Sequence, residues 1–164
     1  MTAKTYDIAV IGAGVFGAWT AWQLRQAGQK VVLLDAYGAA HSRASSGGES
    51  RIIRMGYGAE EIYTRWAMRS LSLWQEFFAR VQQPLFQPTG MLWMAREQDA
   101  YTLATKATFA KLGVAFEELQ RDEMEKRWPQ ISFGPVTWGL YEPNSGALLA
   151  RRAMQAVVAD AIQK

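Results

Sequence analysis

The sequence contains no cysteine and only one histidine, His41, among its 164 residues. Without cysteine the chain can form neither a disulfide nor a thiolate metal site, and one imidazole without a companion makes a zinc site improbable. We therefore predict no metal. The sequence also lacks any apolar run near the roughly 20 residues that a membrane-spanning helix needs. Its first residues, MTAKTYD, lack the basic and apolar regions of a signal peptide. We expect a cytoplasmic protein with no membrane span.

The chain also has only a small excess of positive over negative charge. The formal net charge is +3, and lysine and arginine are scattered among acids rather than gathered in one stripe. This distribution argues against a nucleic-acid partner. With 49% hydrophobic and 20% charged residues, the composition is that of an ordinary globular protein. Seven tryptophans are many for this length, and we expect some of them to pack against chain outside the sequence.

The stretch Asp7–Asp35 has the pattern of a strand, a glycine turn, a helix and a second strand. The apolar run Ile8–Ile11 is typical of a strand that is buried on both faces of a parallel sheet. Gly12, Gly14 and Gly17 follow with the spacing G-x-G-x-x-G. The first glycine permits a tight turn, the second lets a pyrophosphate approach the backbone, and the third lets helix and strand pack closely. The N–H groups and the dipole at the start of the helix favour a phosphate there.

The remainder of this stretch agrees with a dinucleotide site. The predicted buried face of the helix consists of Ala18, Ala21, Trp22 and Leu24. Gly28 ends the helix, and Val31–Leu34 forms the second strand. Asp35 follows that strand, where a carboxylate can accept hydrogen bonds from the ribose hydroxyls and would repel a 2′-phosphate. The unit therefore predicts FAD or NAD rather than NADP. The alternative is a βαβ unit that binds nothing.

The next segment, residues 37–48, is rich in glycine, alanine and serine and has no apolar period, so we predict a loop. It begins where the cofactor is expected. Its hydroxyls and open backbone amides suit a phosphate, and Arg43 could add a charge. The residues that offer these groups are Ser45, Ser46, Gly47 and Gly48. The alternative is an ordinary polar surface loop.

Hydrophobic periodicity and chain-breaking residues predict the remaining elements. Helices are expected over residues 60–80, 99–112, 122–128 and 150–162, and strands over residues 90–95, 114–116 and 136–141. The first of these helices has a core stripe of Ile62, Trp66, Met68, Leu71, Leu73, Trp74, Phe77 and Phe78. The last has an apolar face of Met154, Val157, Val158 and Ile162. The acids of the middle region are expected to form a solvated face: Glu117, Glu118, Asp122, Glu123 and Glu125.

Several segments together resemble one known family. These are the glycine motif with Asp35, the segment ESRIIRMGYG at residues 49–58, KRWP at residues 126–129, and EPNSG at residues 142–146. They are similar to the N-terminal part of the monomeric sarcosine oxidases and N-methyl amino acid oxidases, in the D-amino-acid oxidase superfamily of FAD enzymes. The glycine motif is shared by many flavoproteins, whereas RIIR with YG, and EPNSG, are much more specific. The resemblance spans nearly the whole chain.

The resemblance implies an α/β fold with an FAD-binding Rossmann-type parallel sheet, incomplete in this chain, and the start of a second, mainly antiparallel substrate-domain sheet. Residues 1–58 would form the FAD-binding βαβ unit and flavin loop, and residues 59–83 a packed helix. Residues 84–142 would start the substrate-binding domain, and residues 143–164 would form a helix that returns to the FAD domain. The chain would then be the N-terminal portion of an enzyme whose C-terminal remainder is a continuation or a second chain.

The resemblance also implies residue roles. Arg51 would lie beside the flavin ring, and Arg54 would hold the substrate carboxylate, which a planar guanidinium matches in two-point geometry. Without the resemblance, both would be taken as surface arginines. The residues expected to bind FAD are Gly12, Gly14, Val15, Phe16, Gly17, Asp35, Ala36, Arg43, Ser45, Ser46, Gly47 and Arg51. Several sarcosine oxidases carry a histidine pair where this chain has Ser46 and Gly47, so a histidine that contacts or tethers the flavin from this loop is absent. Sarcosine as the substrate stays open, and any covalent flavin link would come from residues outside this chain.

The implied activity is FAD-dependent oxidation of the C–N bond of an amino acid or N-methyl amino acid, with electrons passed to oxygen to give hydrogen peroxide. The substrate would be a small molecule whose identity the sequence does not fix. Two alternatives remain open. One is a flavin dehydrogenase that uses a quinone or a carrier protein as acceptor. The other is a non-catalytic half that needs a complementary chain.

Overall fold

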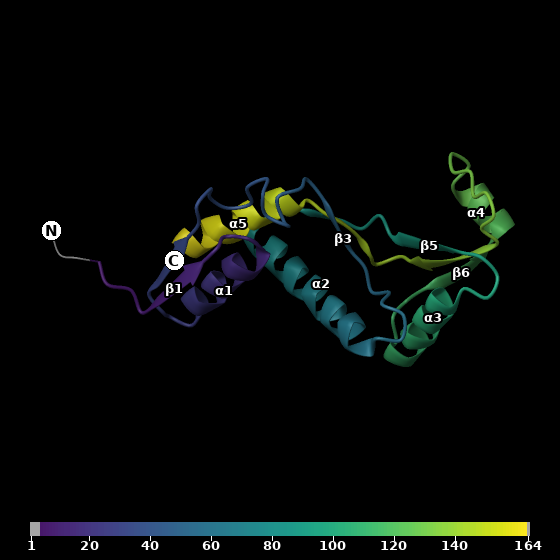
Figure 1. Cartoon of the computed structure of the whole chain (residues 1–164), viewed down its shortest axis with the longest axis horizontal. Coiled ribbons are helices and arrows are strands. Elements are labelled where there is room, and N and C mark those ends of the chain that lie inside the picture. Colours follow the sequence, from purple (N-terminus) through teal and green to yellow (C-terminus); the bar gives the residue numbers. More distant parts are fainter. Residues whose placement is uncertain (1–3, 164) are drawn as a thin grey trace. The chain divides into compact units, whose positions relative to one another are not determined.

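The computed structural model describes residues 4–163, which form two compact units (Figure 1). The first unit consists of residues 4–51, 78–85 and 148–163, and the second consists of residues 52–77 and 86–147. The chain passes from one unit to the other four times. Neither unit is therefore continuous in sequence.

The first unit is built on a parallel βαβ arrangement. Strand β1 (Ile8–Ile11) pairs in parallel with β2 (Val31–Leu34), and helix α1 (Val15–Gln26) connects them. Gly28 has a φ of +81° just after α1, which confirms the predicted glycine stop. Helix α5 (Ala150–Gln163), from the far end of the chain, packs against α1. The predicted strand, turn, helix and strand are all confirmed.

The burial predicted for this unit is partly wrong. We expected β1 to be buried on both faces, yet Ile11 is 87% exposed. Burial alternates along β1, with Ile8 and Val10 half-buried and Ala9 and Ile11 exposed, so one face of the strand is not covered by residues 4–163. On α5, Met154 and Val157 are buried as predicted, but Ile162 is 77% exposed. Ile162 lines an open cavity instead of a packed core.

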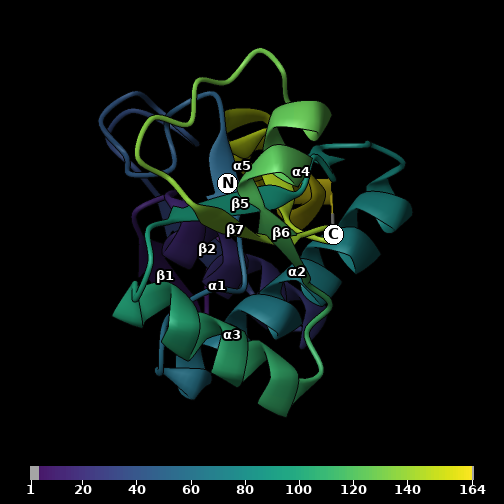
Figure 2. The same ribbon diagram turned by 90° about the vertical axis from the view of Figure 1, so that its right-hand side faces the viewer.

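The second unit contains the predicted antiparallel sheet. Its strands are β5 (Met91–Ala95), β7 (Trp138–Glu142) and β6 (Glu117–Gln120), with β7 in the middle. Met91 lies opposite Glu142, and Glu117 lies opposite Tyr141. Helices α3 (Ala100–Leu112) and α4 (Arg121–Arg127) lie on opposite sides of this sheet, α3 below and α4 above it in Figure 2.

Side chains alternate along β7 and build one core on each side of the sheet. On the α3 side, Phe109 and Leu140 are fully buried and pack with Met55 and Leu71. On the α4 side, the buried cluster is Leu119, Met124 and Phe133. The antiparallel pairing therefore gives each helix its own hydrophobic contact with the sheet.

The helices of this unit have clear end signals. Asp99 caps α3 by accepting a hydrogen bond of 2.7 Å from the N–H of Thr102, and Gly113 ends α3 in the left-handed conformation. A capping box of Gln120 and Glu123 starts α4. These helices agree with the prediction to within one or two residues.

Helix α2 (Glu61–Val81) was predicted as core along its whole length, which is wrong for its N-terminal half. Leu71 and Trp74 are buried, but Ile62 is 49% and Trp66 is 62% exposed. The first turns of α2 carry their aromatic side chains on an uncovered side, while the later turns enter the core.

The strand predicted over residues 114–116 is also wrong. The N–H of Val114 bonds to the carbonyl of Phe109 at the end of α3, and Phe116 packs into the α3 core instead of pairing. The observed strand, β6, begins at Glu117, whose exposed carboxylate pairs with Arg127.

Three very short strands were not predicted. They are β3 (Arg51–Ile53), β8 (Gly146–Leu148) and β4 (Phe86–Gln87), and they form a sheet in the order β3-β8-β4. Runs of two or three residues carry no detectable period, so sequence patterns cannot identify them.

Candidate functional site: a phosphate-binding turn and an unpaired arginine

The glycine turn after β1 has the geometry that its spacing demands. Gly12 adopts a φ of +97°, and its N–H bonds to the carbonyl of Leu34 at 2.7 Å. A Cβ on Gly17 would lie 1.8 Å from the carbonyl oxygen of Gly12, so no larger residue fits there. Gly14 is the N-cap of α1 and offers no side chain to its N–H groups. These groups are therefore left to an external acceptor.

Asp35 ties the end of β2 to this turn. One oxygen of its carboxylate accepts a hydrogen bond of 2.7 Å from the N–H of Ala13, and the other accepts one of 2.8 Å from the N–H of Tyr37. His41 Nε2 lies 3.6 Å from the same carboxylate. The bond from Ala13, then that from Tyr37, holds the pKa of Asp35 below its ordinary value. The carboxylate is thus charged at neutral pH, and its spare lone pairs can accept further hydroxyl groups.

Ser46 places an unused hydroxyl beside the turn. The residue is 8% exposed, and its Oγ is buried with no hydrogen-bond partner anywhere in residues 4–163. This Oγ is also the nearest atom to the point where a Cβ on Gly14 would stand, at 3.8 Å. An unpaired buried hydroxyl costs free energy, roughly 1–3 kcal/mol. A phosphate at the start of α1 would accept its hydrogen bond, so the residues present fit the pyrophosphate of a dinucleotide.

Arg151, in the first turn of α5, holds the serine and glycine loop in place. Its guanidinium donates two hydrogen bonds, of 3.1 and 2.8 Å, to the carbonyl of Gly47 and lies 3.1 Å from the Glu49 carboxylate. Arg151 was not among the residues predicted from the sequence, although a signal was present. A cation in the first turn of a helix opposes the helix dipole and therefore needs partners of its own.

The two cations predicted to bind FAD, Arg43 and Arg51, are exposed and bonded locally. Arg43 lies 4.6 Å over the ring of Tyr37 and donates to its hydroxyl at 2.5 Å. Arg51 donates to the carbonyl of Ser45 at 3.0 Å and to that of Ser50 at 2.7 Å. Val15, Phe16 and Ala36 lie at the same end of the unit, the first two in the opening turn of α1 and the third directly after Asp35.

Arg54 belongs to the second unit, whereas the other predicted site residues belong to the first. Its guanidinium lies between two aromatic rings, 4.7 Å from the centroid of Tyr57 and 4.8 Å from that of Trp93. Nη1 donates to the carbonyl of Gly56 at 2.6 Å. Arg54 forms no ion pair with any carboxylate of residues 4–163.

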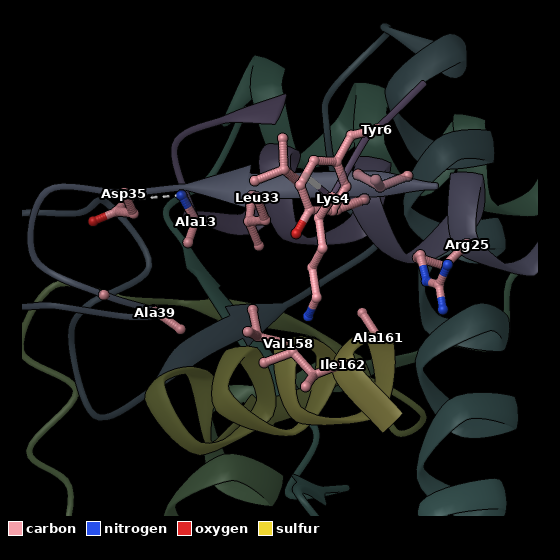
Figure 3. A pocket seen from close by; sticks show the side chains of 14 residues that line it. Lys4, Tyr6, Ala13, Arg25, Leu33, Asp35, Ala39, Val158, Ala161 and Ile162 are labelled. Atoms are coloured by element: carbon pink, nitrogen blue, oxygen red, sulfur yellow. Dashed lines mark hydrogen bonds between the residues drawn. The ribbon is translucent and has the colours of Figure 1, made fainter. Parts of the chain in front are cut away.

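The first unit also contains an open cavity of about 600 Å³ between β2 and α5 (Figure 3). Val158, Ala161 and Ile162 of α5 form one wall, and Asp35 with Ala13 lies at one end. None of the three motif glycines is among the 14 residues that line it. The cavity therefore does not include the glycine turn, although Ala13 and Asp35 lie at its edge.

No group of three or more histidine, aspartate or glutamate side chains in residues 4–163 is placed to hold a metal ion. None of the helices described in that range has the length and hydropathy to cross a membrane.

Comparison with known proteins then identifies the family. Residues 7–164 match the family described as FAD dependent oxidoreductase, abbreviated DAO. The chain belongs to this family. FAD is the cofactor of the DAO family, in agreement with the dinucleotide site predicted from the glycine motif.

Curated relatives in the DAO family include a monomeric sarcosine oxidase from Bacillus sp. (strain B-0618), which is 33% identical over 92% of this chain and 39% of its own length. An N-methyl-L-tryptophan oxidase from Salmonella arizonae is 30% identical over 91% of this chain and 40% of its own length. The chain thus spans about 40% of the length of the curated relatives it matches.

Solved structures support the same fold. NikD, an amino acid oxidase of nikkomycin biosynthesis, superposes with a TM-score of 0.81 at 25% identity, over 98% of this chain and 42% of NikD. The L-proline dehydrogenase from P. horikoshii gives a TM-score of 0.85 at 21% identity, over 99% of this chain and 43% of its own. The second likeness shows the fold alone. The partial FAD-binding fold predicted from the sequence is confirmed.

Proposed function

We propose that this chain is the FAD-binding N-terminal portion of an amine oxidase that oxidises the C–N bond of an amino acid or N-methyl amino acid and passes the electrons to oxygen. The observation that carries the proposal is the buried, unpaired hydroxyl of Ser46 beside the uncapped start of α1. A hydroxyl and free N–H groups at one point form an anion site in a family that binds FAD.

Within this proposal, the residues of the first unit hold the cofactor. The N–H groups at the start of α1 and the Ser46 hydroxyl bind the pyrophosphate, and Asp35 accepts hydrogen bonds from the ribose. Arg51 stands beside the flavin ring, where its permanent charge favours negative charge on the ring. FAD, when bound, supplies the two-electron acceptor for oxidation of the C–N bond. The remaining predicted contacts are those of Val15, Phe16, Ala36, Arg43, Ser45 and Gly47.

Arg54 provides the recognition of the substrate in this proposal. Its guanidinium has no carboxylate partner in the described chain, and two rings restrict its rotation. A restrained, uncompensated guanidinium binds a carboxylate through two parallel hydrogen bonds. An amino acid held in this way presents its α-carbon and amine in a fixed orientation, which is the contribution that a protein makes to such a reaction.

The substrate class is supported by the names of the relatives, which are oxidases of sarcosine and of N-methyl-L-tryptophan. Because Ser46 and Gly47 stand where several sarcosine oxidases have a histidine pair, sarcosine is one candidate among several. We further propose that residues 1–58 and 143–164 serve the FAD domain, and that the missing part of the active site comes from a C-terminal remainder. A cytoplasmic location stays a prediction from the sequence.

The first test is the visible absorption spectrum of the purified chain after addition of FAD and removal of free cofactor. The chain is measured alone and together with a region that corresponds to the other 60% of its relatives. We expect the two visible bands of oxidised flavin to remain with the protein in the second case at least. Protein that stays colourless in both would refute the proposal.

A second test separates the alternatives. The flavin-loaded protein is mixed with a panel of amino acids and N-methyl amino acids, first without oxygen and then in air. Bleaching followed by oxygen uptake supports the oxidase. Bleaching without oxygen uptake would favour a dehydrogenase with another acceptor, and no bleaching with any amine would leave a binding module.

A further inference from the structure

The segment Glu142–Gly146 contains a buried carboxylate that the proposed chemistry does not use. Glu142, the last residue of β7, is 1% exposed. Its Oε2 accepts hydrogen bonds from the N–H of Met55 at 2.7 Å and from the hydroxyl of Ser145 at 2.5 Å. Its Oε1 accepts from the N–H of Gly56 at 3.1 Å and from the indole N–H of Trp93 at 2.5 Å. All of these residues belong to the second unit.

The hydrogen-bond partners of the Glu142 carboxylate are unusual. A buried carboxylate is most often paired with a cation. Here four neutral donors satisfy it, and no lysine, arginine or histidine of residues 4–163 forms an ion pair with it. Glu142 therefore forms no ion pair with nearby Arg54.

Three of the four donors act on the surroundings of Arg54. Met55 and Gly56 directly follow it, and the carbonyl of Gly56 accepts the hydrogen bond from Arg54 Nη1. Trp93 supplies one of the two rings that flank the guanidinium. Glu142 thus fixes both the peptide that Arg54 donates to and one of the rings that Arg54 stacks on.

Arg54 is half-buried, and it lines an open groove of about 300 Å³ in the second unit. Tyr57, Tyr63 and Trp66 line the same groove, with ring centroids 5.8 Å apart from Tyr57 to Tyr63 and from Tyr63 to Trp66. A cation beside aromatic rings suits a small carboxylate that carries an apolar or aromatic group.

We propose that Glu142 is a positioning residue, which orients Arg54 to receive a carboxylate by holding Met55, Gly56 and Trp93. This inference rests on the proposed function, in which Arg54 binds the substrate carboxylate. It assigns a role to the EPNSG segment, because Ser145 adds the fourth hydrogen bond that completes Glu142.

The first measurement uses the 164-residue chain and needs neither FAD nor activity. Amide hydrogen exchange is followed at Met55 and Gly56 in the wild type, in Glu142→Gln and in Glu97→Gln, an exposed control. Glutamine keeps one acceptor oxygen but turns an NH₂ group toward two of the four donors. We expect Glu142→Gln to accelerate exchange at Met55 and Gly56 at least 10-fold. The amide of Gly58, bonded to Thr105 Oγ1 at 3.0 Å, reports general loosening and should change less than 2-fold.

The second measurement uses the FAD-loaded protein completed by its C-terminal region. The dissociation constants of phenylacetate and of phenylacetamide are compared, so that only the charge of the ligand differs. In Glu142→Gln, the misplaced guanidinium should raise the dissociation constant of phenylacetate by about 10- to 100-fold, because binding of this kind depends on sub-ångström placement. The dissociation constant of phenylacetamide should change less than 3-fold. Trp93→Phe keeps an aromatic ring beside Arg54 but loses the N–H donor to Glu142, so it should give a smaller loss of phenylacetate affinity in the same direction.

The outcomes separate this inference from the proposed function. If Arg54→Gln leaves the preference for phenylacetate intact, the carboxylate role of Arg54 is wrong. If Arg54→Gln removes that preference while Glu142→Gln and Trp93→Phe both retain it, the positioning role of Glu142 is overturned. If Glu142→Gln accelerates exchange at Gly58 as much as at Gly56, Glu142 stabilises the surrounding structure in general. The positioning role then depends on Trp93→Phe, which must weaken phenylacetate binding if Glu142 orients Arg54.

Discussion

Replacement of Ser46 by alanine should have opposite effects on the free chain and on FAD binding. In the free chain the hydroxyl is buried without a partner, so its removal abolishes a desolvation cost. Because such groups cost roughly 1–3 kcal/mol, we expect Ser46→Ala to raise the free energy of unfolding by about 1 kcal/mol. Most substitutions at buried positions lower it, so the sign alone is informative.

The same change should weaken FAD binding. A hydrogen bond to a charged acceptor contributes about 1.5–3 kcal/mol, which corresponds to a loss of affinity of roughly 10- to 100-fold. Urea unfolding with and without FAD measures both effects on one protein. Ser42→Ala, an exposed position in the same loop, is the matched control and should change neither value. A variant that is less stable without FAD and binds FAD as tightly as the wild type would show that the Ser46 hydroxyl has another partner.

Three further predictions concern stability and can be checked by urea unfolding. Gly17→Ala should lower the free energy of unfolding by about 1–3 kcal/mol or prevent folding of the first unit, since its Cβ would overlap the carbonyl of Gly12; an unchanged midpoint would contradict the turn geometry. Asp35→Asn should remove part of the pH dependence of stability. Because the pKa of Asp35 is lowered in the folded chain, its contribution to the free energy of unfolding is present above the ordinary pKa of about 3.9 and is lost as pH falls through the folded pKa. The wild type should therefore lose more stability than the variant below about pH 4. Equal losses would show that the bond from Ala13 has no energetic role. Phe109→Ala should cost about 3–5 kcal/mol because the ring is fully buried, and a cost below 1 kcal/mol would mean that this core is not formed.

The parts of the fold that follow from local chemistry were predictable. The glycine motif, the strand before it and Gly28 each act over a few residues, and they specify the parallel βαβ unit without reference to the remaining chain. Burial was less predictable, since it depends on what covers a surface. Ile11 is as apolar as a core residue, but no described element lies over it.

The site was only partly predictable for the same reason. The sequence indicates that Gly12, Gly14 and Asp35 belong to a cofactor site, because their spacing is local. It does not indicate that Glu142 meets Met55, since these residues are 87 positions apart and neither follows a pattern that links them. In the sequence, the EPNSG segment was informative only as a resemblance to the family. Its physical role became visible once the hydrogen bonds of its carboxylate were known.

The divided first unit has a consequence for synthesis on the ribosome. Its helix α1 is completed early, but the indole of Trp22 donates to Asp160, 138 residues later, at 2.7 Å. At a rate of about 5–20 residues per second, roughly 7–28 s pass before that partner is made. During this interval α1 lacks helix α5, which packs against it in the folded unit. The nascent chain therefore exposes apolar surface that a chaperone can bind, and its N-terminal unit can mature only after the second unit has been synthesised.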